Sequence, residues 1–145
     1  MKFPAPDPGL VIRYSYLWKK EYDEGREEGT KDRPCAIVMS VSGSAGELQV
    51  LVLPITHTPP QNQADAIEIP SVTKTRLGLD SDRSWIVIGE ANEFLWPGPD
   101  LRPLPGRDVA TISYGHLPPR FFAHVRDKFL ERDACEKLLH VVRTE

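Results

Sequence analysis

The stretch RPCAIVMSVSGSAGELQVLVLPIT, residues 33–56, decides the fold of this chain. Two runs rich in Val, Leu and Ile lie on either side of SGSAG, residues 42–46, which is a flexible turn of small residues. Apolar runs of this length joined by a short glycine-containing turn are typical of a β-hairpin. We therefore predict that residues 34–41 pair with residues 48–55 as antiparallel strands.

This pairing has a consequence at the open end of the hairpin. It places Arg33, at the start of one strand, beside Thr56 and His57 at the end of the other. The planar fork of arginine matches phosphate oxygens, threonine supplies a short donor, and histidine moves a proton. In an alternative interpretation, Arg33 pairs with the neighbouring Asp32 or with another local acid. The hydroxyls of Thr56 and Thr58 then serve only backbone groups of the turn.

Three further segments have the patterns of short strands. Residues 9–16, GLVIRYSY, alternate in the period of two that is typical of a half-buried strand. SWIVIGE, residues 84–90, is a strand candidate that ends at Glu90. ATISY, residues 110–114, is a short edge strand. With the hairpin, the chain is expected to form five or six short strands.

The remaining segments favour loops and helices. Residues 17–32 are predicted to form a mobile acidic loop, because many charges and two glycines oppose packing. Residues 91–108 contain a proline and glycine cluster that excludes regular structure. One short helix is predicted, with Ser71 as its N-cap and Gly78 at its C-terminal end. Residues 118–144 are predicted to form a helical tail that begins at paired prolines and has an apolar face.

These elements indicate a fold class. Several short strands without long helices between them favour a mainly β fold, a small, strongly bent antiparallel β-barrel or sandwich rather than a parallel α/β sheet. The barrel is expected to carry a short helix insert and a C-terminal α-helix. A length of 145 residues with 40% apolar side chains predicts a single domain over residues 1–145.

Composition excludes several classes of function. The net charge of −3 gives no domain-wide basic field, so any nucleic-acid surface must be local. The chain has no apolar run of about 18 residues and no signal-peptide pattern, so we expect a cytoplasmic protein without a membrane segment. Cys35 and Cys135 lie far apart in sequence and predict neither a metal site nor a disulfide. Phosphate-binding glycine motifs are absent, so we expect no nucleotide cofactor.

A second polar cluster lies at the end of the segment 84–90. Glu90 and Asn92 lie at this strand end, a position where site residues of small barrels gather. A solvated strand terminus explains these residues equally well. Trp96, a little further along, either stacks on a nucleic-acid base or packs the proline-rich loop onto the barrel.

The order of these motifs resembles the MazF/PemK/Kid family of type II toxin–antitoxin toxins. That family has a strand, a mobile loop, a segment like RPALVLS and a segment like PIT. The corresponding segments here are GLVI (9–12), RPCAIVMS (33–40) and VLVLPIT (50–56), and the resemblance covers about residues 9–95. The acidic loop, the proline-rich insert and the long tail indicate a divergent branch.

The resemblance implies an SH3-like barrel that acts as a metal-independent endoribonuclease on single-stranded mRNA, with no cofactor. It places Arg33 at the family's catalytic arginine and Thr56 at the threonine of the PIT element. The ribose 2′-OH then attacks the adjacent phosphorus, and the products carry a 2′,3′-cyclic phosphate and a 5′-OH. Either Glu90 or His57 takes the proton. The residues expected to contact RNA are Lys31, Thr58, Asn92 and Trp96.

The resemblance also implies partners. We expect a cognate antitoxin protein and a homodimer, and the apolar face of the tail is a second reason for the dimer. A rival interpretation is a non-catalytic toxin with a protein target, because the same barrel in CcdB-type toxins poisons DNA gyrase. Those toxins have a C-terminal tryptophan as their signature, whereas this sequence ends in VVRTE. A third interpretation is an inactive descendant that only binds RNA or a partner.

Overall fold

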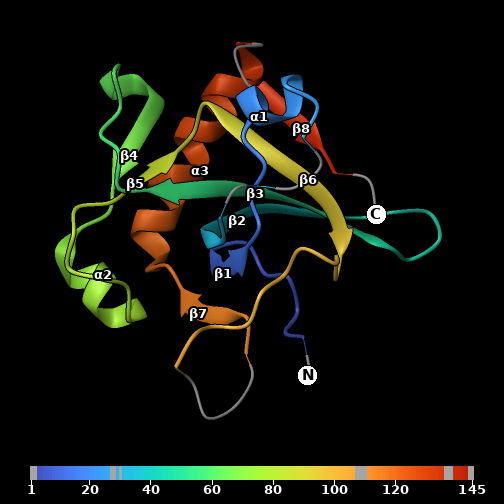
Figure 1. Ribbon diagram of the computed structural model, residues 1–145, viewed down its shortest axis with the longest axis horizontal. Coiled ribbons are helices and arrows are strands. Elements are labelled where there is room, and N and C mark those ends of the chain that lie inside the picture. The colour runs from blue at the N-terminus through green and yellow to red at the C-terminus, as the bar shows by residue number, and fades with distance from the viewer. Residues whose placement is uncertain (1–2, 27–28, 30, 107–110, 136–138, 144–145) are drawn as a thin grey trace.

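The computed structural model describes residues 3–26, 29, 31–106, 111–135 and 139–143. Over these residues the fold is mainly β, as predicted, with one eight-stranded sheet (Figure 1). In chain order the elements are β1 (Leu10–Tyr14), α1 (Lys19–Asp23), β2 (Arg33–Ser42), β3 (Leu48–Thr56), a 3-10 turn (Gln63–Asp65), β4 (Ala66–Glu68), α2 (Ser71–Leu77), β5 (Trp85–Val87), β6 (Glu90–Trp96), β7 (Ser113–His116), α3 (Pro119–Ala134) and β8 (Leu139–Val142).

The β2–β3 hairpin forms with the predicted pairing at its open end. Cys35 lies opposite Pro54, which is the register expected from residues 34–41 and 48–55. Past Ile37 the register shifts by one residue, so Met39 lies opposite Leu51. A β-bulge of this kind bends a strand and increases its twist. The predicted register is therefore wrong in the half of the hairpin near the turn, and it is confirmed at the end that carries Arg33.

The other strands extend outward from this hairpin. The sheet order is β4-β5-β3-β2-β1-β7, and β6 pairs with both β3 and β8. Besides β2, strand β3 pairs with two further strands, because residues 48–52 pair with β6 and residues 55–56 pair with β5. The sheet therefore bends strongly around β3 (Figure 1). Over the described residues it does not close into a complete barrel.

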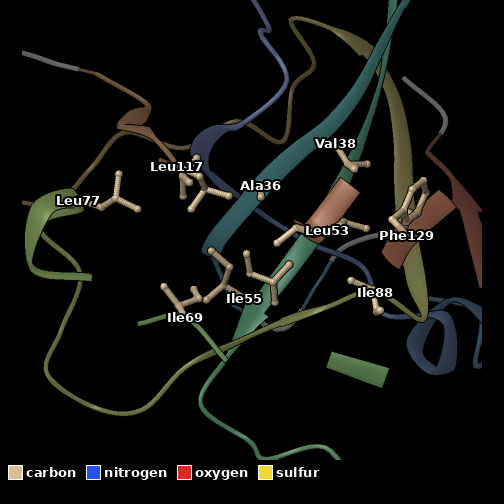
Figure 2. Close-up of a cluster of buried hydrophobic side chains, with 13 residues drawn as sticks. Ala36, Val38, Leu53, Ile55, Ile69, Leu77, Ile88, Leu117 and Phe129 are labelled. Carbon is tan, nitrogen blue, oxygen red and sulfur yellow. The ribbon is translucent and has the colours of Figure 1, made fainter. Parts of the chain in front are cut away.

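Both faces of the central strands are buried. On one face a core packs beneath α2 and α3, with Leu77 and Phe129 contributed by the two helices (Figure 2). On the other face a second core is centred on Tyr14, whose ring stacks on Phe94 of β6 at 4.6 Å between centroids. Three residues of β1 (Leu10, Ile12 and Tyr14) lie in this second core, whereas Val11 lies in the first. Apart from the partly exposed Arg13, β1 is therefore buried on both sides and not on one side as its period of two predicted.

Strand β6 corrects the prediction of irregular structure over residues 91–108. It begins at Glu90, which therefore starts a strand and does not end one. The strand stops at Trp96, directly before Pro97, because proline has no N–H for a sheet hydrogen bond. The proline and glycine cluster excludes strand structure only beyond that point.

The C-terminal tail is only partly helical. Helix α3 covers Pro119–Ala134, as predicted, but β8 follows and pairs in parallel with β6. Residues 136–138 and 144 of the predicted helical tail lie outside the described residues. Strand β8 uses an edge of β6 that would otherwise expose unpaired backbone groups, and its valines suit a strand. Val141 is buried in this position.

Smaller departures occur in the loops. The predicted acidic loop 17–32 contains α1, where the Glu21 carboxylate accepts a hydrogen bond from the backbone N–H of Trp18 at 3.1 Å. Helix α2 ends at Gly78 with φ 72°, as predicted, but its N-cap is Pro70 and not Ser71. Strand β7 begins at Ser113, so Thr111 and Ile112 of the predicted strand precede it, and residue 110 lies outside the described residues. Among the described residues, no helix is long and apolar enough to cross a membrane.

A buried arginine joins the last strand to the first. The Arg143 guanidinium donates to the carbonyl of Ser15 at 2.8 Å and pairs with the Asp100 carboxylate at 2.9 Å. Arg143, Ser15 and Asp100 are all buried. A buried charge that loses its partner costs far more than an exposed one. The proline-rich segment thus supplies, through Asp100, a counter-ion for the arginine that directly follows β8.

We therefore predict that Asp100→Asn lowers the free energy of unfolding by about 3 kcal/mol, because it removes a carboxylate that lies 2.9 Å from the buried Arg143 guanidinium. Urea unfolding followed by tryptophan fluorescence measures this change. The matched control is Asp23→Asn, which removes an exposed ion pair with Lys19 and should leave the midpoint unchanged. Equal midpoints for Asp100→Asn and wild type would contradict the prediction.

Candidate active site

The open end of the hairpin forms a cavity of about 420 Å³. Arg33, Thr56 and His57 all line it, so the structure brings together the three residues that hairpin geometry predicted to converge. Lys31 and Thr58, two of the predicted RNA-contacting residues, line the same cavity. A second cavity of about 390 Å³ shares Arg33, Thr56, Lys31 and Thr58 with the first. These four residues therefore form a wall between two neighbouring cavities.

Arg33 is held on one side by an aromatic ring. Its guanidinium carbon lies 5.0 Å from the centroid of Trp18, and Nη1 donates to the carbonyl of Ile55 at 3.4 Å. Its Nε is buried and has no hydrogen-bond partner among the described residues. The alternative ion pair with Asp32 does not form, because that carboxylate lies beside Arg13 and Arg102. A buried donor without an acceptor is uncommon in folded proteins, and a bound anion would satisfy it.

The threonines of the PIT element form a local turn. The backbone N–H of Thr58 donates to Oγ1 of Thr56 at 3.1 Å, as the alternative interpretation of these hydroxyls expected. A hydroxyl has one donor and two acceptor positions, so this bond leaves the O–H of Thr56 able to donate. The turn thus orients the Thr56 hydroxyl without using its proton.

His57 is bound to a carboxylate that sequence analysis missed. Its Nε2 lies 2.7 Å from Oδ2 of Asp80, while the other oxygen of Asp80 accepts from Lys74 Nζ at 2.8 Å. Lys74 is only 4% exposed, and it also donates to Ser84 Oγ at 2.7 Å and to the carbonyl of Asp82. Partial burial raises the pKa of Asp80, but hydrogen bonds and charge from Lys74 and His57 outweigh it and hold that pKa below its ordinary value.

No local sequence signal relates residue 80 to residue 57. The contact arises because β5 pairs with the end of β3, with Thr56 opposite Trp85. This pairing brings the connection between α2 and β5 beside the end of the hairpin. Trp18, which lies over Arg33, was missed for the same reason, since only the sheet brings residue 18 to residue 33.

Glu90 lies away from the cavities beside Arg33. Its Oε1 accepts hydrogen bonds from the hydroxyl of Tyr16 and from the backbone N–H of Lys19, both at 3.0 Å. Glu90 lines neither of the two cavities beside Arg33. Burial raises the pKa of the Glu90 carboxyl above its ordinary value, although these two hydrogen bonds lower it in part.

Two of the predicted RNA contacts occupy structural positions. Asn92 is 0% exposed, and its side-chain amide bonds both the N–H and the carbonyl of Leu17. Trp96 donates from Nε1 to the carbonyl of Pro4 at 3.1 Å and packs against Phe94. Neither residue lines the cavities beside Arg33. Their positions fit packing, which for Trp96 was the alternative interpretation, and give no support to an RNA contact.

His57, Asp80 and Asp82 form an exposed group of possible metal ligands, with ligand atoms within 4.8 Å of one another. The ammonium of Lys74 already binds a carboxylate oxygen of Asp80 and the carbonyl of Asp82. A cation at this position would meet that positive charge at short range. The oxygen atoms of Asp80 and Asp82 therefore suit the ammonium of Lys74 better than a divalent ion.

Comparison with known proteins leaves the family open. No protein-family model matches this chain, and no curated protein matches it. The resemblance to MazF/PemK/Kid toxins therefore stays a prediction.

The raised pKa of Glu90 predicts a pH-dependent effect of Glu90→Gln. The folded state disfavours the Glu90 carboxylate, so wild type loses stability as pH rises from the ordinary carboxyl pKa through the raised one. Glutamine can still accept both hydrogen bonds but does not ionise. The variant should therefore gain stability relative to wild type as pH rises above the ordinary carboxyl pKa of about 4, as measured by urea unfolding.

Glu68→Gln is the control of opposite sign. A hydrogen bond from Arg83 lowers the pKa of Glu68, so its contribution is present above the ordinary carboxyl pKa and is lost as pH falls. This variant should lose stability relative to wild type as pH rises up to the ordinary carboxyl pKa, and the difference should stay constant at higher pH. A Glu90→Gln difference that does not change with pH would contradict the assignment.

Proposed function

We propose that this protein is an endoribonuclease that cleaves single-stranded RNA without a metal, and that it acts as the toxin of a type II toxin–antitoxin system. The observation that carries the proposal is the convergence of Arg33, Thr56 and His57 in one cavity at the open end of the hairpin. These are an anion-binding group, a short hydroxyl donor and a group that transfers protons. The resemblance to the MazF/PemK/Kid family supports the same chemistry.

Arg33 is suited to bind the scissile phosphate. Its buried Nε lacks an acceptor among the described residues, and its guanidinium packs over the ring of Trp18. A preorganised donor in a partly buried site stabilises charge that develops on phosphate oxygens more strongly than a mobile one does. The Thr56 hydroxyl supplies a second donor. Lys31 adds a positive charge on the same wall.

The reaction is a transfer within the RNA itself. The ribose 2′-oxygen forms a bond to the adjacent phosphorus while the bond from phosphorus to the 5′-oxygen breaks. A general base takes the 2′-OH proton, and the leaving oxygen takes up a proton, so that the products are a 2′,3′-cyclic phosphate and a 5′-OH. Of the two predicted bases, His57 is favoured, because it lines the Arg33 cavity and Glu90 does not.

The second cavity is suited to the nucleoside next to the phosphate. It shares Arg33 and Thr56 with the first cavity, and Pro59, Pro60 and Val87 provide apolar walls. Nucleobases have apolar faces that gain from such contacts, and single strands expose them. RNA strands that thread past Arg33 would thus have one nucleoside in each cavity.

We predict that Arg33→Ala lowers the rate of RNA cleavage by at least about 10²-fold, because the developing charge loses its main donor. The assay incubates a mixed-sequence single-stranded RNA with purified protein in EDTA and analyses the product ends. Wild type should leave cyclic phosphate and 5′-OH ends. The matched control is Arg83→Ala, because Arg83 also stacks on a tryptophan, at 5.0 Å from Trp85, but lines neither cavity.

Other outcomes would redirect the assignment. If the RNA stays intact and a gyrase assay shows trapped DNA breaks, the rival interpretation, a non-catalytic toxin with a protein target, would be favoured. RNA binding without cleavage would favour the inactive descendant. Equal cleavage by wild type and Arg33→Ala would contradict the role of Arg33.

The proposal includes a cognate antitoxin, a cytoplasmic location and a homodimer. The apolar face of the tail supports the dimer only in part, because Val125 and Phe129 of α3 pack into the core of their own chain. Leu139 and Val142 of the tail stay exposed, so the dimer prediction rests on the resemblance and on these two side chains. Light scattering of the purified protein should give twice the mass of 16.3 kDa, and a monomeric mass at the concentrations used in the cleavage assay would contradict it.

A further inference from the structure

We propose that Asp80, anchored by the buried ammonium of Lys74, positions His57 as the general base of the reaction. This inference rests on the proposed ribonuclease function and adds a positioning residue to it. Three side chains form a continuous chain of hydrogen bonds, from His57 Nε2 to Asp80 at 2.7 Å and from Asp80 to Lys74 Nζ at 2.8 Å.

The contact with Asp80 assigns different roles to the two ring nitrogens of His57. A carboxylate beside Nε2 favours the tautomer that carries the proton on Nε2, since only an N–H can donate to it. Nδ1 then holds the free lone pair and is the atom that accepts the proton of the 2′-OH. After that transfer the ring carries a positive charge, which the Asp80 carboxylate stabilises at 2.7 Å.

Lys74 explains how an exposed carboxylate can hold one orientation. Asp80 is half exposed, and a solvated aspartate would move among several rotamers. Lys74 lies in α2 and is fixed by three acceptors, namely Asp80, Ser84 Oγ and the carbonyl of Asp82. Its burial is tolerable because all three ammonium hydrogens have acceptors. The lysine thus holds one oxygen of Asp80 and leaves the other directed at His57.

The segment between α2 and β5 is therefore part of the site. Gly78 and Leu79 also line the cavity, and the backbone N–H of Leu79 donates to the carbonyl of Lys74 at 2.9 Å. His57 comes from the end of β3, whereas its partner comes from this segment. Pairing of β3 with β5 holds the two together, so the orientation of the base depends on tertiary structure.

The test measures both the imidazole and the reaction in Asp80→Asn. A long-range ¹H–¹⁵N spectrum of the folded protein reports which nitrogen of His57 carries the proton. Wild type should show the proton on Nε2, and the variant should show a mixture of tautomers or the reverse. Single-turnover cleavage of RNA in EDTA should fall by about 10²-fold, because an amide neither fixes the tautomer nor stabilises the imidazolium.

Two variants serve as controls. Glu68→Gln removes another carboxylate from an exposed ion pair, with Arg83, and should change neither the His57 spectrum nor the cleavage rate. Asp80→Glu retains the carboxylate and should recover part of the lost rate. A merely structural role of Asp80 would lower the melting temperature and the rate together, without a change of the His57 tautomer.

The possible outcomes separate this inference from the function on which it rests. If wild type cleaves RNA and Asp80→Asn cleaves equally well with an unchanged tautomer, the positioning role is overturned while the ribonuclease stands. If wild type does not cleave any RNA, both proposals fail. Cleavage that needs added Zn²⁺ and stops in EDTA would overturn the inference by making His57 and Asp80 metal ligands.

Discussion

The pairing of β2 with β3 is the constraint on which the rest of the structure depends. Strand β1 pairs with β2, while β5 and β6 pair with different halves of β3, so the sheet extends from this hairpin in both directions. The bulge after Ile37 bends the hairpin near its turn and leaves the open end in its original register. Arg33 and Thr56 therefore meet at a position that the bend does not disturb.

The candidate site contains two cationic side chains that differ in how fully their N–H donors are paired with acceptors. Arg33 has a buried donor that lacks an acceptor among the described residues, whereas Lys74 has an acceptor for each of its ammonium hydrogens. An unsatisfied donor costs stability in the absence of a ligand, and a satisfied buried charge mainly adds rigidity. The first property suits a residue that binds an anion. The second suits a residue that keeps Asp80 in place.

Polar residues near strand ends have two different roles in this fold. At the open end of the hairpin, Thr56 and His57 face a cavity. At the start of β6, Glu90 and Asn92 bond the segment that leads into α1 and its first residue, and Asn92 also lies 3.3 Å from the buried Arg143. Position at a strand end therefore does not distinguish a site residue from one that anchors a neighbouring segment. What distinguishes them is which element covers that end of the strand.

The sequence by itself determined the hairpin, its pairing at the open end, the mainly β fold and the first part of the tail helix. These features are local, because a short turn sets the pairing of its strands and periodicity identifies a helix within a few turns. Only the tertiary structure decided that Trp18 covers Arg33, that Asp80 holds His57, and that β8 turns back to pair with β6. Each of these contacts joins segments far apart in the chain, and the packing of the whole sheet brings them together.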